Sequence, residues 1–239
     1  MFSNVIYKLS TFSDYSSISY NQDDTFTFIK SLSDFNLVPS IYQEILPNGS
    51  LSRRLHFLGN NGLLIMINSG RIDIQLTSDK KEGFDKEAIS SIKEIFMKIY
   101  NCIFSLWGEI VSNPNRLAWY TSCVYFEITE NQKADYRNRF LKEISFFKED
   151  RLDDMIVRYA TRKDANIQDL NEKINIITTI NRIEENLDSD APIDGYRIDY
   201  DINTWQNNKR NRFSCENIET FMNISTDLQQ KLDEEFLHE

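Results

Sequence analysis

The chain has 239 residues, 41% of them hydrophobic with 16 Phe and 11 Tyr, and a formal net charge of −10 at pH 7. This apolar content is enough for a packed core, so the composition excludes a wholly disordered protein. The acidic balance disfavours nucleic acid as a partner, because a negative surface repels phosphate backbones. The charge is uneven, with a net −2 in residues 1–112 and −8 in residues 113–239.

The cysteines and the hydropathy pattern indicate a reduced, cytoplasmic protein with no metal or other cofactor. Only three cysteines occur, far apart and without a Cys-x-x-Cys motif, which disfavours a disulfide framework and a structural zinc site. The opening residues lack the apolar segment of a signal peptide. No stretch approaches the roughly 18 uninterrupted apolar residues of a membrane span.

The first half begins with a strand, predicted over residues 3–12 from their β-branched and aromatic side chains. Asp23 and Asp24 are placed to cap a short helix, which carries apolar residues on one side. Residues 37–45 form a second extended run, with Pro39 near its start, where a missing N–H is tolerated.

The segment from 53 to 76 reads as a hairpin. A phosphate-binding glycine loop joins a strand to a helix, whereas the Gly-Asn-Asn-Gly turn at 59–62 has strand-like residues on both sides. Asn-Gly also suits the positive φ angles of a hairpin turn. The Ser-Gly pair at 69–70 predicts a bulge or bend inside the second run.

A long amphipathic helix follows, with Asp85 as its cap and Pro114 just after its end. Its apolar residues recur at spacings of three and four, which gives one continuous stripe. The stripe consists of Ile89, Ile92, Phe96, Ile99, Ile103, Leu106 and Ile110. Isoleucine is only a moderate helix former, so we expect a sheet to pack on this stripe and stabilise the helix.

The second half repeats this order of elements. It has strands at 116–129, 155–161, 173–183 and 196–205, a helix at 134–147, and a last helix capped by Ser214, with an apolar side from Ile218 to Phe236 through Ile224, Leu228 and Leu232. The predicted fold class is therefore α+β with two similar halves, 1–112 and 113–239, each an antiparallel sheet backed by one long helix plus one short helix. The halves are expected to form one cooperative unit. Joined edge to edge, they would give one broad curved sheet.

Three strings carry a resemblance to a known family: "RLHFLGNNG", "LAWYTSCVYFEIT" and "YRIDYDI" before a capped last helix. Together with the long amphipathic helix, they make most of the chain resemble a sporadically distributed family of bacterial and archaeal proteins with no assigned function. Family members usually carry an acidic turn ending in Gly where this chain has "GNNG". The resemblance implies no catalytic residues, and the family's scattered occurrence suggests a bacterial defence or toxin-control locus, such as one acting against phage.

Few side chains favour an enzyme. His56 and His238 are the only histidines and have no evident catalytic partners. Asp199 and Asp201 alternate on one strand and could bind a divalent cation for hydrolysis, although hard cations need further oxygen ligands and alternating acids are usual on a solvated strand. We expect no catalytic residues, and leave a metal-dependent hydrolase or nuclease as the alternative.

Two sets of residues are candidates for binding. Lys209, Arg210 and Arg212 precede the last helix and could hold an anion beside its free amides. The second set is expected on the solvated face of the sheet and consists of Arg71, Asp73, Trp119, Tyr125, Arg197, Asp199 and Asp201. Trp119 has a competing interpretation as a core residue, because both sides of its strand are apolar.

Aromatic and arginine side chains are enriched at the centres of protein interfaces. The sequence therefore predicts a protein-binding accessory or regulatory module whose partner is another protein, with a homodimer as one form. Nucleic acid and membrane are not expected as partners. A ligand site between the two halves is a further alternative.

Overall fold

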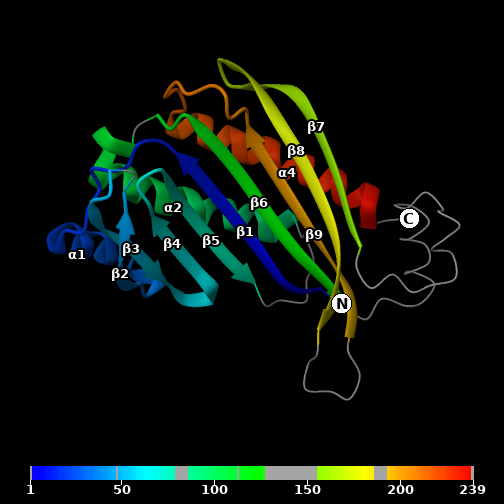
Figure 1. The fold of residues 1–239 in the computed structure, drawn as a ribbon, viewed down its shortest axis with the longest axis horizontal. Coiled ribbons are helices and arrows are strands. Elements are labelled where there is room, and N and C mark those ends of the chain that lie inside the picture. The colour runs from blue at the N-terminus through cyan, green and yellow to red at the C-terminus, as the bar shows by residue number, and fades with distance from the viewer. Residues whose placement is uncertain are drawn as a thin grey trace, which may run out of the picture.

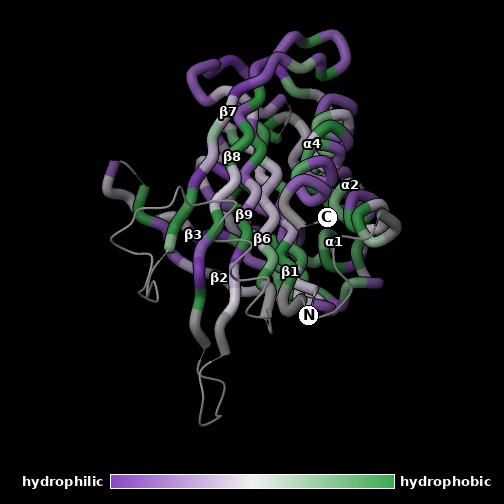
Figure 2. The backbone as a smooth tube through the Cα atoms, turned by 90° about the vertical axis from the view of Figure 1, so that its right-hand side faces the viewer, coloured by the Kyte–Doolittle hydropathy of each residue, from purple (hydrophilic) through white to green (hydrophobic). Residues whose placement is uncertain are grey.

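The structure is a computed structural model that describes residues 2–46, 48–78, 86–111, 113–126, 155–185 and 193–237. In these ranges nine strands form one antiparallel sheet in the order β2-β3-β4-β5-β1-β6-β9-β8-β7. The helices α1, α2 and α4 all lie on the same side of the sheet (Figures 1 and 2). The other side of the described strands carries no helix from these ranges, and it is called the open face below.

The strands are β1 (Phe2–Phe12), β2 (Val38–Ile45), β3 (Leu51–Leu58), β4 (Leu63–Ile67), β5 (Arg71–Ser78), β6 (Arg116–Phe126), β7 (Ile156–Ile167), β8 (Leu170–Glu185) and β9 (Ile193–Thr204). The α-helices are α1 (Gln22–Ser31), α2 (Lys86–Val111) and α4 (Cys215–Leu237). Two short 3-10 turns, η1 (Ser33–Phe35) and η2 (Asn60–Gly62), complete the described elements.

The predicted fold class, with two similar halves that each have a sheet, a long helix and a short helix, is wrong. Strand β1 pairs with β5 on one side and β6 on the other, so Phe12 stands opposite both Arg71 and Arg116. Two separate sheets would leave the edges of β1 and β6 unpaired, and an exposed edge favours pairing with another strand. The sheet is therefore continuous. The short helix predicted at 134–147 lies outside the described residues.

The core under the helices is also continuous from one end of the sheet to the other. Trp119 on β6 contacts the ring of Tyr7 on β1 at 6.3 Å and the ring of Phe96 on α2 at 5.8 Å, measured between centroids. Helix α2 has the predicted apolar stripe, in which Phe96, Ile99 and Ile103 are fully buried. The buried apolar residues of both halves thus belong to one cluster.

The segment from 53 to 76 is the predicted hairpin, with one correction. Asn61 and Gly62 adopt positive φ angles of 56° and 70° between β3 and β4, which confirms the hairpin interpretation. A side chain at Gly62 would place its Cβ 2.6 Å from the carbonyl oxygen of Thr77. Of the bulge or bend predicted at 69–70, the bend is present, but it lies between two strands and not inside one. The chain reverses there, with the N–H of Asn68 donating to the carbonyl of Arg71, because a two-residue turn joins β4 to β5.

The helix caps agree only in part with the sequence. The cap of α1 is Asn21, whose side chain accepts from the N–H groups of Asp23 and Asp24, so the predicted cap is two residues too late. Ser214 caps α4 as predicted, since its Oγ accepts from the N–H of Asn217 at 3.2 Å. The cap expected for α2, Asp85, lies outside the described residues.

The buried side of α4 changes character along its length. Its first half buries Ile218, Phe221 and Met222, as an amphipathic helix should. Its second half buries polar residues instead, namely Ser225, Thr226, Gln229 and Asp233. The predicted apolar positions 224, 228 and 232 are only partly buried beside them.

Candidate interaction face

The open face is defined by the register of six neighbouring strands. Leu9, Trp119 and Ile202 stand side by side in register and are buried under the helices. Because side chains alternate across a strand, their sequence neighbours point to the open face. In β1 and β5–β9 these residues are Ile6, Lys8, Ser10, Phe12, Arg71, Asp73, Gln75, Thr77, Arg116, Ala118, Tyr120, Ser122, Val124, Arg158, Ala160, Arg162, Asp164, Lys173, Asn175, Ile177, Thr179, Asn181, Arg197, Asp199, Asp201 and Asn203.

Of the seven residues predicted on the solvated face of the sheet, the structure places five on the open face and one on the opposite side. Arg71, Asp73, Arg197, Asp199 and Asp201 all belong to the open face by register. Trp119 is on the opposite side, fully buried, with its indole nitrogen donating to Gln229. The side chain of Tyr125 lies outside the described residues. The expected pairing of an exposed Trp119 with these charges is therefore wrong.

The carboxylate of Asp73 belongs to the open face but is buried below its surface. The Asp73 side chain is fully buried, while that of its ion-pair partner Arg71 is 44% exposed. Arg71 Nε lies 2.8 Å from Asp73 Oδ2, and Ser10 on the neighbouring strand donates its hydroxyl to Oδ1 at 2.5 Å. These contacts compensate for the loss of hydration of the buried carboxylate.

Asp199 and Asp201 are likewise held by protein donors. The hydroxyl of Tyr120 donates to Asp199 at 3.0 Å, and Arg197 Nε donates to the other carboxylate oxygen at 3.2 Å. Asp201 accepts from the side-chain amide of Asn203 at 2.9 Å. No group of three or more His, Cys, Asp or Glu in the described ranges is arranged to hold a metal ion. Both carboxylates therefore take part in hydrogen bonds among the side chains of the open face.

Three basic side chains of this face lie against aromatic rings, and the sequence interpretation missed all of these contacts. The guanidinium carbon of Arg116 is 4.6 Å from the ring centroid of Phe12, and that of Arg71 is 6.0 Å from the same ring. Lys8 Nζ lies 4.8 Å above Tyr120. A strand register would have found these pairs, because Phe12 stands directly opposite both arginines.

A second set of contacts extends the network to the edge strand β7. Arg162 on β7 lies over the ring of Trp205 at 5.6 Å and donates from Nε to Asn175 at 2.7 Å. Asn175 in turn donates to Asn203 at 3.1 Å. Because Asn203 donates to Asp201, one chain of hydrogen bonds crosses β7, β8 and β9 on the open face.

Burial changes the acid–base behaviour of two residues in this network. Partial burial lowers the pKa of Arg116, and the nearby positive charge of Arg71 lowers it further, against the opposing effect of Asp201. Burial also raises the pKa of Tyr120, with the charge of Asp199 acting in the same direction. Arg116 Nε is buried without a hydrogen-bond partner among the described residues.

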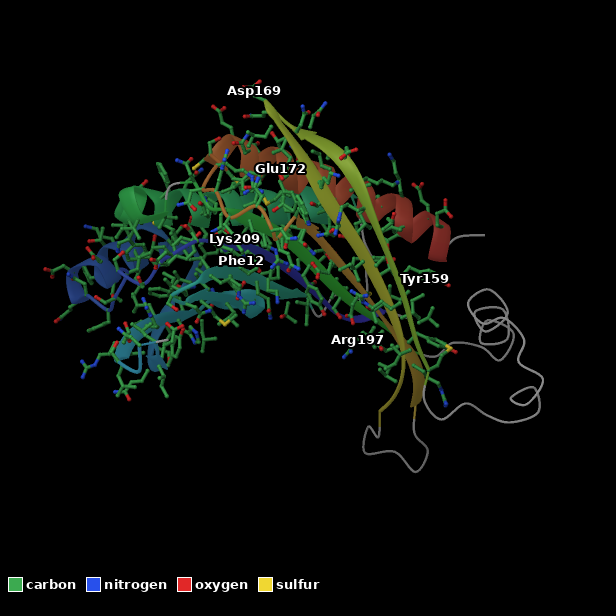
Figure 3. The ribbon with its side chains drawn as sticks, turned by 45° about the horizontal axis from the view of Figure 1, so that its top comes forward. Phe12, Tyr159, Asp169, Glu172, Arg197 and Lys209 are labelled. Carbon is green, nitrogen blue, oxygen red and sulfur yellow. The ribbon has the colours of Figure 1, made fainter. Side chains whose placement is uncertain are left out.

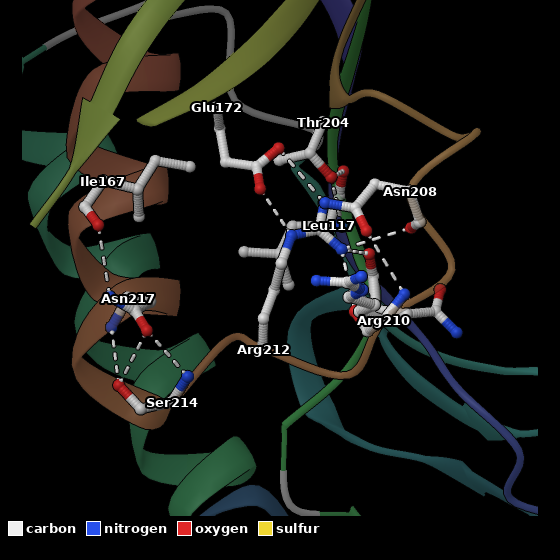
Figure 4. A network of polar contacts seen from close by, with 10 residues as sticks. Leu117, Ile167, Glu172, Thr204, Asn208, Arg210, Arg212, Ser214 and Asn217 are labelled. Carbon is white, nitrogen blue, oxygen red and sulfur yellow. Dashed lines mark hydrogen bonds and ion pairs between the residues drawn. The ribbon is translucent and has the colours of Figure 1, made fainter. Parts of the chain in front are cut away.

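The predicted anion site before α4 does not form as a cluster. Arg212 turns inward, where Nε and Nη2 donate to the two carboxylate oxygens of Glu172 and Nη1 donates to backbone carbonyls, including that of Asn115 (Figure 4). Glu172 is itself buried. Lys209 and Arg210 remain exposed. Arg212 therefore stabilises the connection between β9 and α4, and its guanidinium is not free for a ligand.

The remaining reactive residues are scattered. His56 stacks on Tyr42 with a centroid distance of 4.1 Å, and burial lowers its pKa against the opposing charge of Asp73. Cys102, Cys123 and Cys215 form no disulfide among the described residues. His238 lies outside the described residues. The described helices include none that is both long and apolar enough to cross a membrane.

Comparisons with models of known protein families, with curated proteins and with solved structures find no match to this chain. The family resemblance in the sequence therefore rests on the three quoted strings, and the function has to be argued from the open face itself.

Proposed function

We propose that the protein is a protein-binding accessory or regulatory module that works in the cytoplasm and holds its partner on the open face. The observation that carries this proposal is the network of arginine, tyrosine and carboxylate side chains on a face that carries no helix from the described ranges. Aromatic and arginine residues are favoured at the centres of protein interfaces, and their side chains here are already ordered by contacts within the sheet. Three cysteines that form no disulfide among the described residues agree with a reducing compartment.

The alternatives have less support. Asp199 and Asp201 accept hydrogen bonds from protein donors, so the observations do not favour a metal-dependent hydrolase. The boundary between the two halves, where a small ligand was expected, is filled by the paired strands β1 and β6 and by Trp119. Neither alternative is proposed.

Site-specific photo-crosslinking in living bacteria tests the proposal. A photoreactive amino acid is placed at Ala160 or Gln75, both on the open face, and at Ser91 or Asp227 as matched sites on the outer sides of α2 and α4. We expect a discrete protein adduct from the two open-face positions and none from the two helix positions. Adducts from the helix positions alone would contradict the proposal.

A further inference from the structure

The open face has the opposite charge to the rest of the chain. Among the side chains that the structure describes in β1 and β5–β9, this face carries seven basic ones, Lys8, Arg71, Arg116, Arg158, Arg162, Lys173 and Arg197, and four acidic ones, Asp73, Asp164, Asp199 and Asp201. The described part of this face is therefore net positive, although the whole chain has a net charge of −10.

The basic side chains of two ion pairs on this face are also more exposed than their acidic partners, which makes the accessible surface more positive. Arg71 and Arg197 are 44% and 47% exposed, whereas their partners Asp73 and Asp199 are 0% and 15% exposed. Arg158 and Arg162 are exposed on β7. At these two ion pairs, a molecule that approaches the face meets the guanidinium group before the carboxylate.

Several of these cations form no ion pair within the described ranges. Lys8, Arg116, Arg158 and Arg162 form no ion pair with a carboxylate in the described ranges. Figure 3 places Arg197 toward one end of β9 and Phe12, the ring beneath Arg116, well away from it, so the positive groups are spread along the strands. The face thus presents separated cations.

We propose that the partner on the open face is an acidic protein segment whose carboxylates pair with these arginines. This inference rests on the proposed function and names the chemistry of the partner. The guanidinium carbons of Arg116 and Arg162 lie 4.6 and 5.6 Å from the ring centroids of Phe12 and Trp205. Nε of Arg162 donates to Asn175 and Nε of Arg116 is buried, so the terminal Nη groups are the donors that would pair with a carboxylate of the partner.

The spacing of the cations favours a peptide over nucleic acid. Arg158 and Arg162 are four residues apart on one strand, which is about 13 Å at the usual rise of a strand. Duplex DNA carries one negative charge per about 1.7 Å of its axis. The closely spaced phosphates of a nucleic acid would also be repelled by Asp199 and Asp201 and by the net negative charge of the chain. Carboxylates separated along a peptide match the separated guanidinium groups better.

Binding of a short synthetic peptide of alternating Glu and Tyr, followed by fluorescence anisotropy, tests the inference. The variant Arg158→Gln/Arg162→Gln/Lys173→Gln removes three cations from the open face. The control Lys30→Gln/Arg53→Gln/Lys231→Gln removes three exposed cations from elsewhere and changes the net charge equally. We expect the first variant to bind about tenfold more weakly, since each exposed ion pair contributes a factor of about two to three, and the control to bind like the wild type.

Three results would overturn the inference: an equal loss in both variants, no binding of the peptide to the wild type, or tighter binding of a single-stranded DNA of the same charge. If the peptide fails while a protein still cross-links to Ala160, the partner is not acidic and the proposed function stands. If the peptide binds as expected but no protein cross-links to the open face, the charge inference stands and the proposed function fails. Thermal melts of both variants show that they are folded.

Discussion

The indole nitrogen of Trp119 donates a hydrogen bond to Oε1 of Gln229 at 3.0 Å, and this contact ties a central strand to the last helix. The hydroxyl of Thr121, two residues further along β6, donates to the same oxygen at 2.9 Å. All three side chains are fully buried. The polar half of α4 is thus held on the sheet by specific hydrogen bonds in addition to apolar packing.

Trp119→Ala should lower the free energy of unfolding by about 3–5 kcal/mol, as is usual when a large buried aromatic residue is removed. Trp119→Phe should cost less, because Gln229 Oε1 still accepts from Thr121. Urea denaturation measures both values. Phe104→Ala, at a position on α2 that is 40% exposed, is the control and should cost about 1 kcal/mol or less. Equal losses for Trp119→Ala and Phe104→Ala would mean that Trp119 is not part of the core.

Trp119 also shows where the sequence pattern stopped being informative. Both sides of β6 are apolar, and the polar residues Thr121 and Glu127 suggest that the side with Trp119 is the more solvated one. Thr121 is buried because a residue 108 positions later accepts its hydrogen bond. No local pattern contains that partner. Glu127 lies outside the described residues.

Where alternation was clean, the sequence was sufficient. Arg71 and Asp73 alternate with Ile72 and Ile74, and the structure places the two pairs on opposite sides of β5 as predicted. Strand order was not predictable in the same way. The β1–β6 pair joins residues about a hundred positions apart, and it makes the sheet continuous, as expected if the two halves join edge to edge.

The stability of the protein should fall as pH rises from about 4 to about 7 because of Asp233. Burial raises the pKa of Asp233 to about 7, although Tyr200 and Gln229 oppose this through hydrogen bonds. The folded protein therefore holds this proton at pH values at which the unfolded chain has released it. The folded state binds more protons in this window, so the free energy of unfolding decreases with pH and becomes constant above about pH 7.

Asp233→Asn should remove this contribution and make the protein more stable than the wild type at pH 8. Asp227→Asn, at an exposed position of the same helix, is the matched control and should follow the wild type. Urea denaturation at several pH values gives the comparison. A wild-type difference from Asp233→Asn that does not vary with pH would contradict the raised pKa.

Glu44→Gln should destabilise the protein strongly, by about 3 kcal/mol or more, because it leaves the charge of Arg54 buried without its counter-ion. Arg54 has no exposed side-chain area, and its Nε lies 2.7 Å from Glu44 Oε2. The double variant Arg54→Met/Glu44→Gln should lose less than Glu44→Gln alone, since no buried charge remains. Chemical denaturation measures both. A larger loss in the double variant would show that the contacts of Arg54 with the carbonyls of Tyr15 and Ile18 matter more than the charge.

The edge strand β2 should be the main route to aggregation at high protein concentration. It exposes Val38, Ile41 and Ile45, the last at 73%, and an exposed apolar edge is a template for further strands. Ile45→Lys should slow aggregation, measured by light scattering. Ile156→Lys, on the opposite edge strand β7, should have a smaller effect, because β7 already carries Arg158, Arg162 and Lys163. Equal effects would mean that the two edges do not differ.

Thermal unfolding of the whole chain should show one transition, with equal calorimetric and van't Hoff enthalpies. The physical reason is that α2 and α4 share the core around Trp119, so neither half keeps its packing without the other. Fluorescence of the tryptophans and far-UV circular dichroism should give the same midpoint. Two separate midpoints would assign independent stability to residues 1–112 and 113–239.

The central position of β1 has a consequence for how the protein is made. The ribosome releases β1 well before one of its two neighbours, β6, which follows more than a hundred residues later. Until then the first half exposes an unpaired strand edge that belongs in the middle of the finished sheet. Such long-range pairing is slow and leaves nascent chains prone to association. We therefore expect nascent chains to associate with one another more readily before β6 has been synthesised than after it.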